Sequence, residues 1–118
     1  MLKFIEKNSR GRFVEECDCS VGNYEQKGKH YGIVVTFYNY SWKRILQSDE
    51  YIVSAFENGK IYFKKSDKRN GYKLTHQSPT SIVSTKKYHF PTDVRVSSKK
   101  YGYLEFDKNY GLYYLTVE

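Results

Sequence analysis

Long apolar runs are missing from this 118-residue chain, and proline, cysteine, methionine and tryptophan are scarce. No stretch approaches the about 20 apolar residues of a membrane-spanning helix, so no membrane span is expected. The first residues, Met1 to Glu6, contain no apolar run and no small-residue cleavage site, which excludes a secretory signal there. We therefore expect a cytoplasmic protein in a bacterial host cell. In such a reducing compartment, the two cysteines favour thiols or metal ligands over a disulfide.

Recognisable catalytic motifs are also lacking. The histidines, His30, His76 and His89, stand outside any nucleophile or metalloprotease motif, and no glycine-rich phosphate loop occurs. A hydrolase pairing Cys17 or Cys19 with a histidine is the enzymatic alternative, and its activity would be lost on cysteine substitution. No residue is assigned a catalytic role, and we predict that the protein is not an enzyme.

Aromatic residues are abundant: the chain has 13 Tyr and 7 Phe. Tyrosine is favoured in strands and at binding surfaces, so this composition indicates a strand-rich binding protein. Runs of β-branched and aromatic residues predict strands at 33–38, 51–56, 60–65, 72–75, 82–83, 88–90, 101–106 and 112–117. Weaker runs at 2–5 and 12–14 are further strand candidates.

Turn and helix signals lie between these runs. Asn58-Gly59 predicts a hairpin turn, and Asp107 to Gly111 predicts another turn. Residues 41–47 are the clearest helix candidate, with Ser41 as its N-cap. Within the strand at 60–65 we expect Phe63 in the core. Residues 21–30 have little apolar content and are expected to form a loop or an extended arm.

The predicted fold is mainly β, a small barrel or sandwich in one domain, 1–118. A loop-rich segment, 1–31, precedes two similar units, 32–75 and 81–118. Each unit has a strand, a short helical turn with an arginine, a second strand, an acidic-glycine turn and a third strand. We interpret the units as a duplication, because two such units can bury each other's open faces. The alternative is a chance likeness of two hairpins.

The second unit suggests a family. Tyr88-His89-Phe90-Pro91-Thr92-Asp93-Val94-Arg95 leads into a hairpin, and residues 88–117 resemble the swapped-hairpin unit of AbrB-type regulators, as residues 37–65 do in part. The resemblance covers about half of the chain. It implies a barrel of two units that binds duplex DNA through basic residues beside the first strand. Lys86 and Lys87 match that position in the second unit, and Lys27 and Lys29 match it in the first.

The net charge of +7 is unevenly distributed. Residues 1–59 are balanced, residues 60–100 hold eleven Lys or Arg against two acids, and residues 101–118 are net acidic. Such asymmetry favours an anionic partner, although a solvated basic face that keeps the protein soluble is the alternative. The candidate binding residues are Lys60, Lys64, Lys65, Lys68, Arg69, Lys73, Lys86, Lys87, Arg95, Lys99 and Lys100.

Cys17-Asp18-Cys19 is the sharpest local motif. Zinc takes four ligands, mostly Cys and His, so Cys17, Cys19 and His30 are candidate ligands of one structural zinc ion. His76, His89 or a nearby carboxylate, Asp18 or Glu16, would complete the site. The alternative is two small, semi-buried cysteines at a strand edge.

Two functions from different classes follow. The first is a non-enzymatic inhibitor or modulator, of the type that phages and mobile elements encode, which acts through a basic face on a nucleic-acid-handling partner. Its concrete version is an inhibitor of a host defence nuclease, similar to the anti-CRISPR proteins, and its partner is an acidic protein surface or a nucleoprotein complex. The second is an AbrB-like transcriptional regulator that binds duplex DNA.

Overall fold

The computed structural model describes residues 17–48, 50–75 and 84–118. The predicted strands at 2–5, 12–14 and 82–83, together with His76 and Glu16, lie outside these ranges. The elements in chain order are β1 (Cys19–Gln26), β2 (Lys29–Phe37), α1 (Ser41–Arg44), β3 (Tyr51–Glu57), β4 (Lys60–Ser66), β5 (Tyr72–Lys73), β6 (Lys86–Pro91), β7 (Lys100–Gly102), β8 (Glu105–Asp107) and β9 (Leu112–Thr116). Among the described residues, no helix is long and apolar enough to cross a membrane.

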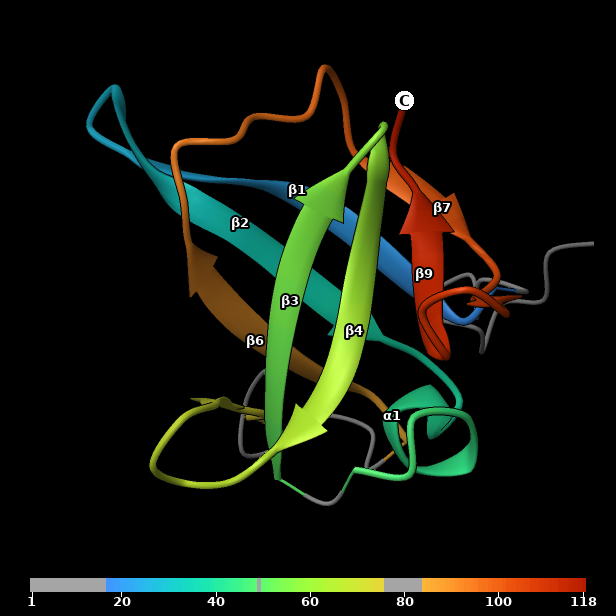
Figure 1. Cartoon of the computed structure of the whole chain (residues 1–118). Helices are drawn as coiled ribbons and strands as arrows, with labels where there is room; N and C mark the ends of the chain where they lie inside the picture. Colours follow the sequence, from blue (N-terminus) through green and yellow to red (C-terminus); the bar gives the residue numbers. More distant parts are fainter. Residues whose placement is uncertain (1–16, 49, 76–83) are drawn as a thin grey trace, which may run out of the picture.

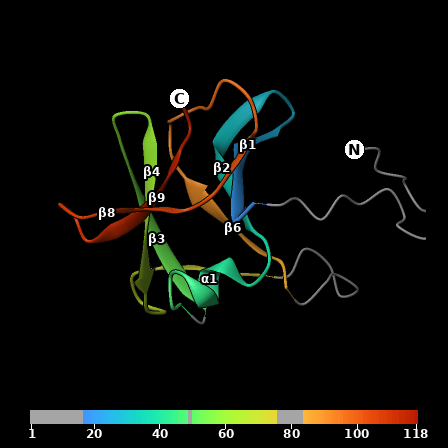
Figure 2. The ribbon, with the colours of Figure 1, turned by 90° about the vertical axis from the view of Figure 1, so that its right-hand side faces the viewer.

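The predicted mainly β class is confirmed, with two antiparallel sheets packed face to face. Sheet A has the strand order β6-β2-β1-β7, and sheet B has the order β5-β3-β4-β9-β8. Sheet B lies in front of sheet A in Figure 1, and the two layers are seen edge-on in Figure 2. The β1–β2 hairpin extends past the rest of the sandwich at the upper left of Figure 1.

Tight turns set the two long hairpins. Asn58 and Gly59 have φ angles of 52° and 73°, and Lys27 and Gly28 have φ angles of 51° and 76°. Two consecutive positive φ values give the turn whose twist suits a two-residue hairpin. The predicted Asn-Gly hairpin is therefore confirmed. The expected loop or arm at 21–30 is wrong, because it contains β1, a Lys-Gly turn and the start of β2.

The core lies between the sheets and is aromatic at its centre. Phe37 of sheet A meets Phe63 of sheet B edge to face at 5.3 Å between ring centroids, and Tyr88 stacks on Phe37 at 6.0 Å. Phe63 is 1% exposed, as expected from the sequence. Burying one such ring contributes about 1.5–3 kcal/mol. The buried Tyr88 hydroxyl is hydrogen-bonded to Ser54 of β3, which links the two layers.

Two connections tie the edges of the sheets together. At one edge, Thr75 and Lys87 exchange backbone hydrogen bonds of 2.8 and 2.9 Å, which joins the β5 segment to β6. At the other, the chain crosses from β7 in sheet A to β8 in sheet B. The carboxylate of Asp18 accepts a 2.8 Å hydrogen bond from the Leu104 amide at this crossing. The strand predicted at 101–106 is therefore divided between two sheets.

The helix begins at Ser41 as predicted, but it ends at Arg44 instead of residue 47, and its cap differs. Tyr40 is the N-cap residue, in a left-handed conformation, and no side chain of the described residues caps the first turn. The Ser41 hydroxyl instead donates a 2.6 Å hydrogen bond to the Asp18 carbonyl and is fully buried. The prediction of Ser41 as a cap was wrong because its hydroxyl is used in tertiary packing.

The proposed duplication stays a prediction. β2 pairs antiparallel with β6 and β4 pairs antiparallel with β9, as a two-fold relation between the units would require. The units differ in detail, however, because residues 92–99 form no helix and the counterpart of β3 is the divided β7–β8 segment.

Candidate nucleic-acid interface

The outer face of sheet A combines aromatic rings with cations. Strand residues alternate between the two faces of a sheet. Cys19, Val21, Ile33 and Val35 are fully buried on the inner face, so the alternate positions face outward. The outward positions include Ser20, Gly22, Tyr24, Gln26, Lys29, Gly32, Val34, Thr36, Lys87, His89, Pro91 and Tyr101. None of these positions holds a carboxylate.

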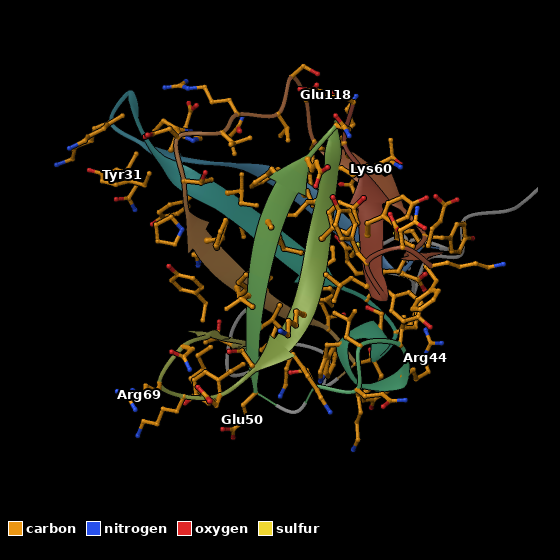
Figure 3. All side chains as sticks on the ribbon, in the orientation of Figure 1. Tyr31, Arg44, Glu50, Lys60, Arg69 and Glu118 are labelled. Carbon is orange, nitrogen blue, oxygen red and sulfur yellow. The ribbon has the colours of Figure 1, made fainter. Side chains whose placement is uncertain are left out.

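Rings cluster around the hairpin end of this face. The centroids of Tyr24 and His89 are 4.4 Å apart, and those of Tyr24 and Tyr31 are 6.1 Å apart. The Gln26 side-chain amide donates a 2.8 Å hydrogen bond to the Tyr24 hydroxyl, which fixes that ring. Tyr31 is the extra residue at an irregularity in the β1–β2 ladder and is 47% exposed. Figure 3 shows it near the end of the hairpin, below the turn.

Gly32 makes this arrangement possible. Its φ is +151°, and a Cβ there would lie 2.2 Å from the carbonyl oxygen of Phe90 in β6. Only glycine lets β2 approach β6 so closely, because every other residue carries a Cβ. This contact sets His89 of β6 beside the rings of β1 and β2.

A second group lies at the β7 end of the same face. Tyr101 is 47% exposed, and the Lys99 ammonium lies 5.1 Å from its ring centroid. A Cβ added to Gly22 would lie 3.6 Å from the Lys99 side chain, which places that lysine over β1. Beside it, the Ser20 and Tyr38 hydroxyls are hydrogen-bonded at 3.1 Å. Lys29, 5.4 Å from the Tyr31 ring, is the matching cation at the hairpin end.

His89 is the titratable group of this face. Its pKa is lowered, first by burial and then by the nearby Lys87. The lowered pKa leaves the imidazole neutral at pH 7. A neutral ring can stack on a base, whereas a phosphate beside it would favour its protonated form.

The eleven basic residues predicted as binding residues do not gather on one face. Lys87 and Lys99 lie on the outer face of sheet A, while Lys60, Lys64 and Lys73 lie on that of sheet B. Lys65, Lys86 and Lys100 have inward register positions at strand ends, and Lys68, Arg69 and Arg95 lie in loops. Lys60 and Arg69 lie toward opposite ends of β4 in Figure 3. These residues are dispersed because the segment 60–100 contributes strands to both sheets.

Several of these cations are already engaged within the described chain. Arg95 lies 3.2 Å from the carboxylate of Glu25, Lys60 lies 4.6 Å from the Tyr114 ring centroid, and Lys86 lies 5.4 Å from that of Trp42. In contrast, Lys64, Lys65, Lys68, Arg69 and Lys73 sit close together around the β4–β5 loop, with no ion pair inside the described ranges.

The candidate zinc ligands are not brought together. Cys19 is opposite Phe37 in the β1–β2 ladder, whereas His30 is opposite Glu25, which is ~20 Å further along β1. Cys19 is fully buried, and burial, with Asp18 and Cys17 nearby, raises its pKa well above the usual range of a thiol. Across residues 17–48, 50–75 and 84–118, no group of three His, Cys, Asp or Glu side chains forms a metal site. Zinc binding stays a prediction that would need ligands other than His30.

His30 instead helps to hold the β6–β7 connection. Its Nε2 lies 3.0 Å from the Val94 carbonyl oxygen, so this nitrogen carries the proton and donates. Its Nδ1 is buried, lies 3.6 Å from Glu25 and has no hydrogen-bond partner in the described part of the chain. Asn23 makes two further hydrogen bonds to the Val96 backbone, of 2.7 and 2.9 Å.

The outer face of sheet B has a different chemistry. Tyr62 donates a 3.0 Å hydrogen bond to Asp107, and Tyr110 donates one of 2.6 Å to Glu57. A hydrogen bond to Glu105 raises the pKa of Tyr114. Burial and Asp107 raise the pKa of Tyr62 to about 12, so its hydroxyl remains a donor. We call these six residues the tyrosine–carboxylate cluster.

Sequence reasoning missed most of the rings on the outer face of sheet A. Tyr24 and Tyr31 fall in the segment 1–31 that was expected to be loop-rich, where glycine and polar residues obscured the alternation. The usable signal was Cys19-x-Val21 facing Ile33-x-Val35-x-Phe37, which is an apolar period of two on each side of Lys27-Gly28.

Comparisons with protein-family models, with curated protein sequences and with solved structures found no match.

Proposed function

We propose that the protein is a non-enzymatic nucleic-acid-binding protein that binds single strands on the outer face of sheet A. The observation that carries this proposal is a sheet face whose described strand positions hold no carboxylate and that carries Tyr24, Tyr31, His89, Tyr101, Lys29, Lys87 and Lys99. Cations neutralise phosphates, and rings stack on exposed bases without reading their sequence.

A single strand suits this face better than a duplex does. The rings are spread across sheet A, with Tyr24 in β1, His89 in β6 and Tyr101 in β7. Stacking on such rings requires unpaired bases. Each stacked base contributes about 1–3 kcal/mol, and each neutralised phosphate adds a salt-dependent part.

The test is fluorescence anisotropy with a labelled oligothymidylate at several salt concentrations. A triple variant, Lys29→Glu with Lys87→Glu and Lys99→Glu, is expected to weaken binding at least 30-fold. It should also reduce the slope of log affinity against log salt by about 2 for a single strand. The matched control is a triple variant on the side of sheet B, which changes the net charge by the same amount: Lys64→Glu with Lys73→Glu and Lys108→Glu. Equal losses for the two triple variants would contradict the proposal.

Duplex DNA is the second candidate, favoured by one feature. The β1–β2 hairpin is a two-stranded ribbon with Lys27 and Lys29 at its tip, and such ribbons can enter the major groove. This function would suit the AbrB-like regulator expected from the sequence. Tighter binding to a duplex than to the oligothymidylate, lost with Lys27→Glu, would favour it.

An acidic protein surface can also engage cations and rings. The expected role as an inhibitor of a nucleic-acid-handling partner, such as a host defence nuclease, remains a proposal for this chain. The inhibitor role is favoured if the protein binds neither DNA form at low salt but binds a purified nuclease. Both roles, nucleic-acid binding and inhibition of a protein partner, agree with the prediction that the protein is not an enzyme.

A further inference from the structure

A groove lies at the end of sheet B where the pairing of β4 with β9 stops. It has a volume of about 320 Å³ and runs between the residues after α1, the end of β4 and the start of β9. Its lining combines apolar side chains, Leu46, Phe63, Leu112 and Tyr113 among them, with Lys64 and Lys65. This volume lies in the range of about 300–1,000 Å³ typical of ligand pockets.

The groove is bordered by an open strand edge. β4 pairs with β9 only from Lys60 to Phe63, whereas it pairs with β3 along its whole length to Ser66. Beyond Phe63, no backbone hydrogen bond outside the β3–β4 ladder involves Lys64, Lys65 or Ser66 in the described part of the chain. An unpaired edge is a template on which an extended peptide adds as a further strand.

Cations flank this edge on both sides of the sheet. Lys64 is opposite Val53 on the outer face, and Lys65 is opposite the buried Ile52 on the inner face. Neither has an ion pair among residues 17–48, 50–75 and 84–118. An incoming strand with acidic side chains would therefore meet a cation whichever way each side chain points.

The wall opposite β4 is held in an uncommon conformation. Gln47 has a φ of 54° although it is not glycine, and it lines both this groove and an adjoining, more polar depression with Glu50 and Tyr51. Residues held in the left-handed region gather at binding sites.

We propose that this groove binds an extended acidic segment of a protein partner, which adds beside Lys64–Ser66 and inserts one apolar side chain between Leu46, Phe63 and Tyr113. The backbone edge supplies affinity, the apolar floor selects the anchor side chain, and the two lysines select acidic neighbours. This interaction is separate from nucleic-acid binding on sheet A and does not depend on it.

The probe is a labelled seven-residue peptide with one phenylalanine between two runs of three glutamates. Titrated into the unaltered protein, it should bind saturably and shift the amide NMR signals of residues 45–47, 64–66 and 112–113. Replacing its phenylalanine with glycine should weaken binding at least tenfold. Lys64→Glu with Lys65→Glu should do the same, whereas Lys68→Glu with Arg69→Glu, the matched charge change in the adjoining loop, should cost less than threefold.

Three results would overturn the proposal: no saturable binding, equal affinity for the glycine peptide, or amide shifts confined to the outer face of sheet A. The NMR map uses the unaltered chain, so it decides the question even if a charge variant misfolds. Nucleic-acid titrations of the two double variants then test the sheet A proposal separately.

Discussion

The outer faces of the two sheets use tyrosine in opposite ways. On sheet B, the hydroxyls of Tyr62 and Tyr110 donate to the carboxylates of Asp107 and Glu57, so the rings are held within the protein's own hydrogen bonds. On sheet A, Tyr31 and Tyr101 are 47% exposed beside lysines and have no carboxylate partner among the described residues. The same residue type is therefore hydrogen-bonded within the fold on one face and exposed beside lysines on the other.

The largest effect, on the free energy of unfolding, is expected from disturbing the close approach of β2 to β6 in sheet A. Gly32→Ala places a Cβ against the Phe90 carbonyl and should lower the free energy of unfolding by about 3 kcal/mol or more. Gly28→Ala is the matched control, because Gly28 also has a positive φ but, within the described ranges, no atom lies within 4 Å of the added Cβ. It should cost only about 1 kcal/mol. Urea denaturation measures both, and similar losses would show that the close approach of β2 and β6 is unimportant.

Removing exposed rings sharpens the comparison without disturbing the core. Tyr31→Ala with Tyr101→Ala should weaken binding of an oligothymidylate about 100-fold, because each stacked base contributes about 1–3 kcal/mol. Phe106→Ala with Tyr110→Ala removes two rings of similar exposure from the side of sheet B and should leave the affinity unchanged. Anisotropy titrations give both values. A larger loss from the sheet B pair would reverse the assignment of the two faces.

The pH dependence of binding tests His89. Burial and Lys87 lower its pKa, so the ring is neutral at pH 7 and gains a proton as the pH falls. A bound phosphate favours the protonated form, so affinity should rise about three- to tenfold between pH 7.5 and pH 5.5. His89→Phe keeps a ring but cannot titrate, and it should abolish most of this rise. A rise of the same size in the variant would assign the effect to another group.

The smallest effect concerns the tyrosine–carboxylate cluster. Hydrogen bonds from the Tyr110 amide, the Tyr62 hydroxyl and the Asn109 amide lower the pKa of Asp107. A lowered carboxyl pKa stabilises the fold above the unfolded-state pKa of about 3.9, and this stability is lost as the pH falls through the folded-state pKa. Asp107→Asn should therefore lower the melting temperature modestly at pH 7 and less at pH 3. Oligothymidylate affinity should not change.

The sequence predicts the β3–β4 hairpin well, but it predicts the β1–β2 hairpin and the sheet assignment poorly. Asn58-Gly59 and its flanking β-branched residues specify β3 and β4 locally, so that hairpin is predicted closely. The predicted strand 101–106 is divided between the two sheets at Leu104. There, the Leu104 amide donates a hydrogen bond to the carboxylate of Asp18, which is far away in the sequence. Likewise, the Ser41 hydroxyl donates a hydrogen bond to the Asp18 carbonyl, and no local sequence pattern indicates this contact.

The candidate site was predicted even less completely, for a physical reason. Counting charges along the chain locates an excess in 60–100, but strand alternation and the passage through both sheets distribute those lysines over several faces. The ring of Tyr24 comes close to His89 only because β2 pairs with both β1 and β6, the latter more than 50 residues away in the sequence. Such pairing is set by the tertiary fold.

An NMR titration of the isotopically labelled protein with an oligothymidylate tests the central claim most directly. Amide signals of Tyr24, Tyr31, His89 and Tyr101 should shift in a saturable manner, while those of Tyr62, Tyr110 and Tyr114 should remain in place. Shifts confined to sheet B, or no shifts at low salt, would contradict the assignment of the outer face of sheet A as a nucleic-acid surface.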